Sequence, residues 1–120
     1  MFKFEKLTIW QKSLELGEKA NEISKEFPMD ERFNLKSQMM RSIDSVALNI
    51  SEGSISQSNR QLRKFISYSI GSLAEFVTCL SKSKLRSYIS EKEFNSLYTD
   101  CELLMKQIIA FKNSIPSKNS

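Results

Sequence analysis

The stretch FPMDERFNLKSQMMRSIDSVALNISEG, residues 27–53, decides the fold of this chain. Pro28 stops a preceding helix, because the residue before a proline is pushed out of the helical region. After a short connector, apolar residues recur every three or four positions, which is typical of a helix with one buried face. Gly53 stands where a glycine commonly ends a helix. We therefore predict a helix over residues 35–53, with its apolar face formed by Leu35, Met39, Ile43, Val46, Ala47 and Ile50.

The same helical spacing continues on both sides of this stretch. It predicts helices over residues 7–27, 59–87 and 91–114, with residues 115–120 as a frayed tail. The sequence has only 3 Gly and 2 Pro, so little interrupts these helices. Four helices with short connectors predict an all-α protein, an antiparallel up-down-up-down four-helix bundle. Residues 1–120 suffice for one core, so we predict a single four-helix-bundle domain.

The predicted helices carry more apolar residues than the core of one four-helix bundle requires, and the third carries a glycine in its interior. The apolar stripes of the first and third predicted helices are wider than one packing seam, which favours self-association. Gly71 falls in the middle of the third predicted helix, where glycine costs about 1 kcal/mol relative to alanine. We interpret Gly71 as a place where a neighbouring backbone approaches closely.

The residues that usually carry out chemistry are scarce. The chain has no His, which removes the commonest general base and metal ligand. Its two cysteines, Cys79 and Cys101, lack the spacing of a zinc site, and we interpret them as small buried apolar groups. We therefore expect no catalytic residues, no metal, no cofactor and no enzyme activity. No apolar run is long enough for a membrane span, and MFKFEKL does not resemble a signal peptide, so we expect a cytoplasmic protein without a membrane partner.

Positive charge is concentrated in one part of the chain. The formal net charge is +4, and residues 53–90 carry six basic residues against Glu75 alone. Three of them, Arg60, Arg63 and Lys64, lie in the first turns of the third predicted helix, where the helix dipole disfavours positive charge. One interpretation is a contact with nucleic-acid phosphates, and the other is a solvated surface. The remaining three basic residues are Lys82, Lys84 and Arg86, at the other end of that helix. The helix dipole favours positive charge there, so we expect these residues to cap the helix.

Polar residues stand among the core positions of the decisive stretch. Arg41, Asn49 and Glu52 adjoin residues that should be buried, and polar groups in such places need partners. We interpret them as a structural polar network within or between protomers. Trp10 is interpreted as a core or interface anchor rather than a platform for stacking bases. Tyr68 and Tyr88 carry no distinguishable signal.

Three segments of the chain resemble one known family. They are FEKLTIWQKSLEL at residues 4–16, the decisive stretch extended to residue 54, and FISYSIGSLAEFVTCL at residues 65–80. The middle segment has the pattern L-x-x-Q-x-x-R-(x)7-N-I-S-E-G. In order and spacing, these segments resemble the four-helix-bundle family named for intervening sequences in 23S ribosomal RNA genes. That family is related to the accessory variability determinant proteins of diversity-generating retroelements. The chain departs from the family where Ser51 replaces a frequent alanine and where Ala47 or its neighbour replaces a frequent proline.

The resemblance implies a homopentameric ring of four-helix protomers without known catalytic activity. In the retroelement branch, the ring is basic, binds nucleic acid and associates with a reverse transcriptase. We therefore expect a homo-oligomeric scaffold that binds RNA or DNA phosphates through Arg60, Arg63 and Lys64, with a reverse transcriptase or another protein as a further partner. The alternative is a structural or regulatory protein–protein interaction module that binds no nucleic acid.

Overall fold

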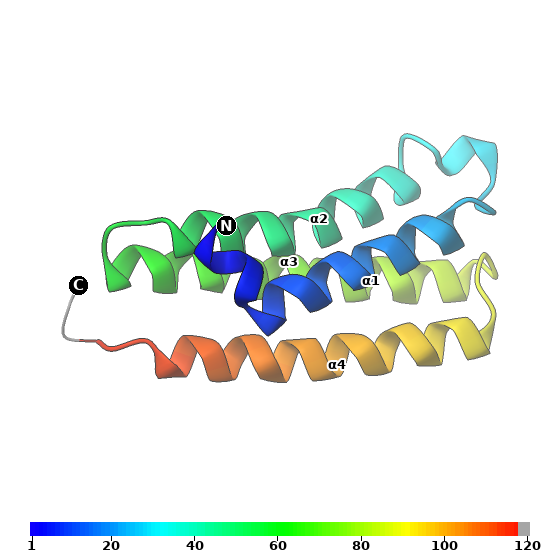
Figure 1. Cartoon of the computed structure of the whole chain (residues 1–120). Helices are drawn as coiled ribbons and strands as arrows, with labels where there is room; N and C mark the ends of the chain where they lie inside the picture. The colour runs from blue at the N-terminus through cyan, green and yellow to red at the C-terminus, as the bar shows by residue number, and fades with distance from the viewer. Residues whose placement is uncertain (118–120) are drawn as a thin grey trace.

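Helices joined by short connectors make up residues 1–117, which the computed structural model describes (Figure 1). Consecutive α-helices run in opposite directions, and the molecule measures 48 × 24 × 23 Å. No strand occurs among the described residues, so the all-α class is confirmed. The α-helices are α1 (Thr8–Ser24), α2 (Leu35–Ser54), α3 (Asn59–Leu85) and α4 (Glu91–Ser114), and the short 3-10 helices are η1 (Lys3–Lys6) and η2 (Met29–Glu31).

The core lies along the predicted apolar face of α2. All six predicted positions on that face are buried, and α2 packs most extensively against α3. From α3, Leu73, Phe76 and Leu80 are fully buried, and Ile108 of α4 joins the same cluster. Each such side chain contributes roughly 1.5–3 kcal/mol by leaving water. The helical spacing in the sequence therefore identified the buried face of α2 correctly.

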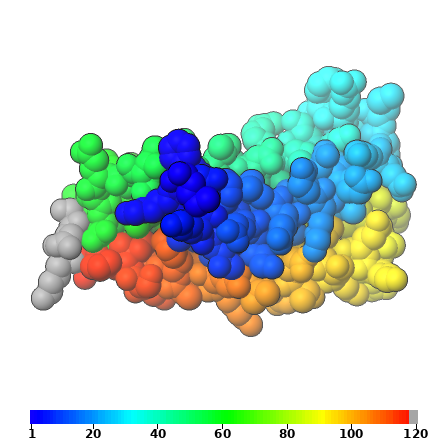
Figure 2. All heavy atoms as spheres, in the orientation of Figure 1, coloured from blue at the N-terminus to red at the C-terminus, as the bar shows by residue number. Residues whose placement is uncertain are grey.

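The N-terminal helix η1 folds back onto the bundle. It contacts both α1 and α2, and Figure 2 shows it in dark blue on the surface over these helices. Aromatic rings around η1 lie in a row: Phe2 stacks on Phe4 with 5.3 Å between ring centroids, and Phe4 lies 5.3 Å from Trp10 of α1 with the ring planes tilted by 56°. This packing brings the start of the chain next to the connector between α2 and α3.

The helix ends differ from the predicted ones where a tertiary contact intervenes. Helix α1 ends at Ser24 rather than residue 27, because Phe27 leaves the helix and packs against Tyr88 with 5.4 Å between ring centroids. Helix α3 ends at Leu85 rather than residue 87, because Ser87 adopts a left-handed conformation with φ 62°.

The glycines and the tail also differ from expectation. Gly53 lies inside the last turn of α2 with a negative φ, and a Cβ there would stand 2.9 Å from the Phe65 Cβ. Close packing against α3 therefore explains Gly53 better than a helix-ending conformation. Around Gly71, nothing lies within 4 Å of a built Cβ, so the expected close approach does not occur within the protomer. Ile115 is buried, so the predicted tail is anchored at its start, and residues 118–120 lie outside the described residues.

Candidate nucleic-acid interface

Two of the predicted basic residues share an exposed face at the start of α3. Ser58 caps the helix by accepting a hydrogen bond from the backbone N–H of Gln61 at 3.1 Å. Arg60 and Lys64 follow one turn apart, and both are exposed. The first turn of α3 contains no acidic residue. The positive end of the helix dipole and the two side-chain charges therefore act together on any nearby anion.

Arg63 has a different environment from its two neighbours. It is half-buried, and its Nη1 donates a hydrogen bond to the Pro116 carbonyl oxygen at 2.5 Å. This contact joins α3 to the segment that follows α4. The structure thus brings all three predicted residues into the first turns of α3, but Arg63 is engaged by the chain itself. Arg60 and Lys64 are the two that face outward.

A polar groove of about 340 Å³ adjoins this helix start at the connector between α2 and α3. The Ser56 hydroxyl donates a hydrogen bond to the Gly53 carbonyl oxygen at 2.6 Å, which tightens the connector. Sequence reasoning missed the contribution of Lys3, because only the folding of η1 onto α2 brings that ammonium group to this place. The residues that line the groove are Lys3, Gly53, Ser54, Ser56, Gln57, Ser58, Asn59 and Leu62.

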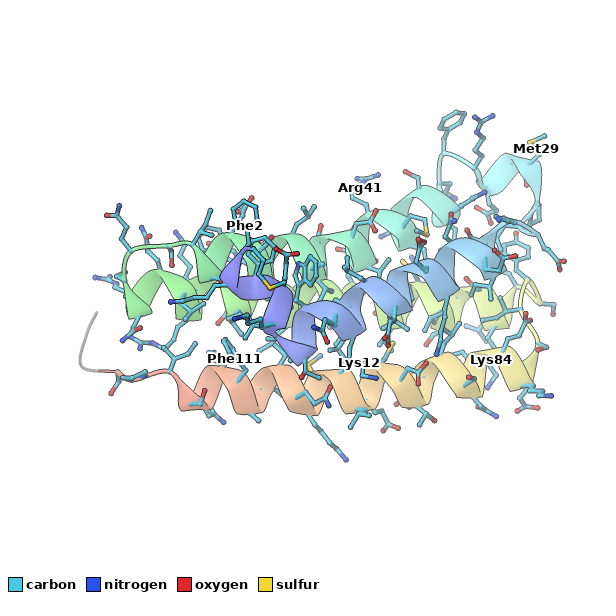
Figure 3. The ribbon with its side chains drawn as sticks, viewed as in Figure 1. Phe2, Lys12, Met29, Arg41, Lys84 and Phe111 are labelled. Atoms are coloured by element: carbon cyan, nitrogen blue, oxygen red, sulfur yellow. The ribbon has the colours of Figure 1, made fainter. Side chains whose placement is uncertain are left out.

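The predicted polar network of α2 does not form within the described part of the protomer. Arg41 projects away from α2 (Figure 3) and donates a hydrogen bond to the Ser37 hydroxyl at 3.1 Å. Asn49 donates its amide N–H to the Ser45 carbonyl oxygen at 2.8 Å. Glu52 is exposed, and no ion pair links it to Arg41 within residues 1–117. A network that joins these residues between protomers stays a prediction.

At the opposite end of α3, a buried carboxylate joins two connectors. Glu31 of η2 accepts hydrogen bonds from the Tyr88 hydroxyl at 2.7 Å, the Arg86 guanidinium at 2.8 Å and the Asn34 amide at 2.9 Å. The hydrogen bond from Tyr88 is the main cause that lowers the pKa of Glu31, and the same bond raises the pKa of Tyr88. Sequence reasoning missed Glu31, since nothing along the chain marks a connector carboxylate as buried.

Two of the three basic residues predicted at this end, Lys84 and Arg86, are engaged with the chain itself. Besides the bond from Arg86 to Glu31, Lys84 lies 3.9 Å from the Glu91 carboxylate and 4.5 Å from the centre of the Phe94 ring. These contacts agree with the structural role predicted for the C-terminal end of α3. The opposite ends of α3 thus differ, because Arg60 and Lys64 carry no such ion pair in residues 1–117.

An apolar groove with acidic residues lies between α1 and α2. It encloses about 770 Å³, and two exposed apolar side chains, Leu14 and Leu48, line it together with Trp10. Its charged residues are all acidic: Glu15, Glu18 and Asp44. Partial burial raises the pKa of Asp44, and the charge of Glu18 adds to this effect. Trp10 therefore lies where phosphates would be repelled, which favours its interpretation as an anchor over a base-stacking role.

The groups that could support chemistry are inaccessible or dispersed. Burial raises the pKa of the Cys101 thiol to about 12 and also raises that of Cys79, so both remain protonated. Within residues 1–117, no cluster of three or more His, Cys, Asp or Glu side chains could hold a metal ion. None of the helices in that part of the chain has the length and apolar character needed to cross a membrane.

Comparison with known proteins identifies relatives by sequence and by fold. The sequence model of the 23S rRNA-intervening sequence protein family matches residues 5–110. A crystal structure from Bacteroides thetaiotaomicron, of a protein with unknown function from the S23 ribosomal protein family, superposes with a TM-score of 0.81. The two sequences are 21% identical, and the match covers 88% of this chain and 96% of that chain. At this identity, the likeness shows a shared fold alone. No curated protein matches the sequence significantly.

Proposed function

The chain belongs to the 23S rRNA-intervening sequence protein family, and we propose that it is a non-catalytic, homo-oligomeric scaffold that binds nucleic acid. The observation that carries this proposal is the α3 basic surface, which we define as Lys3, Arg60 and Lys64. Arg60 and Lys64 are exposed on the first turns of α3, and Lys3 lines the polar groove that includes Asn59. Two exposed cations on the first turns of a helix, with a third in the groove at its start, favour a phosphate backbone as the ligand.

The proposed affinity depends on repetition of this surface. A single protomer offers few phosphate contacts, and each contact adds to affinity by releasing a counterion. In a ring of identical protomers, the α3 basic surface is repeated around the ring. One nucleic-acid strand can then contact several copies at once, so several weak contacts together give a high affinity. We propose the homopentamer that the family resemblance implies, with RNA or DNA as the ligand and a reverse transcriptase or another protein as a further partner.

The groove between α1 and α2 supports self-association. Leu14 and Leu48 are 45% and 59% exposed there, and exposed apolar side chains that lie together are typical of protein contacts. A second copy of the chain that covers this groove would remove them from water. The same observation favours the second candidate function, a protein–protein interaction module without nucleic-acid binding. In that case, the partner would bring apolar and basic side chains to the acidic groove.

The proposal includes no catalytic step. The chain has no His, and neither thiol is available as a thiolate. A carboxylate that could act as a base, Glu31, has its hydrogen-bonding capacity occupied by Tyr88, Arg86 and Asn34. The remaining surface can bind a partner and position it.

The test compares two double variants with the same change in net charge. Arg60→Glu/Lys64→Glu reverses the α3 basic surface, and Lys92→Glu/Lys106→Glu reverses two exposed cations of α4. Fluorescence anisotropy with labelled RNA and DNA measures affinity, and light scattering measures oligomer mass. We expect the first variant to lose at least about tenfold in affinity with its mass unchanged, and the second to lose far less. Equal losses in both variants would contradict a specific role for the α3 basic surface.

A further inference from the structure

One exposed aromatic ring lies on the same face of α3 as the basic residues. Tyr68 follows Lys64 by four residues, as Lys64 follows Arg60, so the three side chains form a row along the helix. Four residues of α-helix rise about 6 Å, which makes the row about 12 Å long. The Tyr68 side chain is 49% exposed. Sequence reasoning did not single out this tyrosine, because its exposed fraction and its contact with Phe65 depend on the fold.

The ring of Tyr68 contacts two neighbours, Phe65 and Lys64, and remains about half exposed. The edge of the Phe65 ring lies against it, with centroids 5.9 Å apart and planes at 89°. The ammonium group of Lys64 lies over the Tyr68 ring, 5.9 Å from its centre, on a flexible side chain that can move to a phosphate. An aromatic ring with a fixed neighbour and a cation beside it matches the composition of surfaces on which single-stranded nucleic acids stack their bases.

The surface next to Tyr68 is unobstructed. Gly71 lies three residues further along α3, is exposed, and has nothing within 4 Å of the position that a Cβ would take. The bare backbone leaves open space on the side of Tyr68 away from Lys64. In addition, α3 contains no acidic residue before Glu75, so no negative charge on this helix opposes a phosphate near the ring.

Two other partly exposed aromatic residues, Trp10 and Tyr98, lack this combination. Trp10 lines the groove with Glu15, Glu18 and Asp44, whose charges repel phosphates. Tyr98 resembles Tyr68 in exposure, at 39%, and in its stacking on another ring, with 5.5 Å to Phe94. However, Tyr98 lines a groove with Glu102 as well as Lys106, so a negative charge offsets the positive one there.

We propose that Tyr68 is a stacking platform for an unpaired base, so that the α3 basic surface prefers single-stranded nucleic acid. This inference rests on the proposed nucleic-acid binding. Arg60 and Lys64 contact successive phosphates, and the base of an adjacent nucleotide lies on the exposed face of the Tyr68 ring. A duplex cannot make the last contact, because its base faces are covered by neighbouring base pairs. The preference for a single strand therefore depends on the ring rather than on the charges.

The experiment measures anisotropy with a labelled single strand and with the same strand annealed to its complement. We expect wild-type protein to bind the single strand more tightly. Tyr68→Ala should lower single-strand affinity about five- to hundredfold and leave duplex affinity unchanged. Tyr68→Phe keeps the ring and should stay within about twofold of wild type. Tyr98→Ala is the matched control, since it removes a similarly exposed ring from the acidic helix, and it should change neither affinity.

Two outcomes would overturn the inference, and they are distinguishable. If Tyr68→Ala binds the single strand as tightly as wild type while Arg60→Glu/Lys64→Glu does not, the platform is wrong and the basic surface stands. If wild-type protein binds neither single strand nor duplex, the proposed function and the inference fall together. Circular dichroism of each variant verifies that the helices are intact.

Discussion

Gly53 and Gly71 are both helical glycines, but their surroundings are opposite. A Cβ at Gly53 would stand 2.9 Å from the Cβ of Phe65 and 3.1 Å from Cδ1 of Leu62. The first of these atoms is fixed to the backbone of α3 and cannot rotate away. At Gly71, a Cβ would meet nothing within 4 Å. The first glycine thus permits a close helix crossing, and the second has no packing role in the protomer.

This contrast predicts that a glycine-to-alanine substitution changes the free energy of unfolding in opposite directions at the two positions. Gly53→Ala should destabilise the protein by roughly 1–3 kcal/mol, because α2 and α3 must move apart. Gly71→Ala should stabilise it by about 0.5–1 kcal/mol, because alanine loses less conformational entropy in a helix. Urea unfolding followed by circular dichroism measures both. A stabilised Gly53→Ala variant would show that the two helices do not approach as described.

Ser87 supports a second prediction for a single residue. Its φ of 62° is costly for a residue with a Cβ, and it ends α3 in a Schellman motif. The Tyr88 N–H bonds the Ser83 carbonyl at 2.9 Å, and the Ser87 N–H bonds the Lys84 carbonyl at 3.0 Å. Ser87→Gly should raise the free energy of unfolding by about 1 kcal/mol. An unchanged or lower stability in the same urea experiment would contradict the left-handed assignment.

Among the structural elements, the two connectors at one end of the bundle are joined through Glu31. This carboxylate belongs to η2, while Arg86 and Tyr88 follow α3. Hydrogen bonds, chiefly from Tyr88, hold the pKa of Glu31 below its ordinary value. A group whose pKa is lowered on folding stabilises the folded state above its unfolded pKa of about 4.3. That contribution is lost as the pH falls through the folded pKa.

Glu31→Gln should therefore make the free energy of unfolding less dependent on pH in the acid range. The variant is less stable than wild type near neutral pH, because the charge-assisted hydrogen bonds are lost. The difference in stability between variant and wild type should narrow as the pH falls below the unfolded pKa of about 4.3 and through the lowered pKa of Glu31, because wild type then loses the same contribution. Thermal unfolding at a series of pH values measures this. Glu91→Gln, which removes an exposed carboxylate 3.9 Å from Lys84, is the control and should cost less stability near neutral pH.

The helices could be predicted from the sequence more accurately than their ends. Apolar spacing determines which residues face the core, so the buried face of α2 was predicted correctly. The ends depend on contacts between distant segments, such as Phe27 against Tyr88, which spacing does not encode. The same holds for the candidate interface. Arg60 and Lys64 follow from charge and helix position, whereas Lys3 becomes part of the surface only when η1 folds onto α2.

For the whole molecule, the account predicts that the groove between α1 and α2 is covered by another copy of the chain. Leu48→Glu should lower the oligomer mass, because it places a charge among the groove's apolar side chains and adds to its acidic residues. Leu48 is 59% exposed in the protomer, so the fold should tolerate the change. Light scattering after size-exclusion chromatography gives the mass. Leu85→Glu, at an 85% exposed position ending α3, is the control and should leave the mass unchanged.

The distribution of charge over the molecule is the main support for the proposed nucleic-acid binding. At the start of α3, Arg60 and Lys64 carry no ion pair within residues 1–117, whereas at and just beyond its other end Lys84 contacts Glu91 and Phe94, and Arg86 contacts Glu31. Such a surface binds phosphates only by displacing their counterions, so its affinity must depend on salt. Shape or apolar contact alone would not produce that dependence.

The most direct test is the affinity of the wild-type protein for a labelled single strand across a salt series. The account predicts measurable binding at low salt and a logarithmic slope that steepens by about 0.7 for each phosphate contact. In an oligomer that repeats Arg60 and Lys64 around a ring, the slope should exceed the value for two contacts. The absence of binding at low salt, or an affinity independent of salt, would contradict the account and point to the protein–protein module instead.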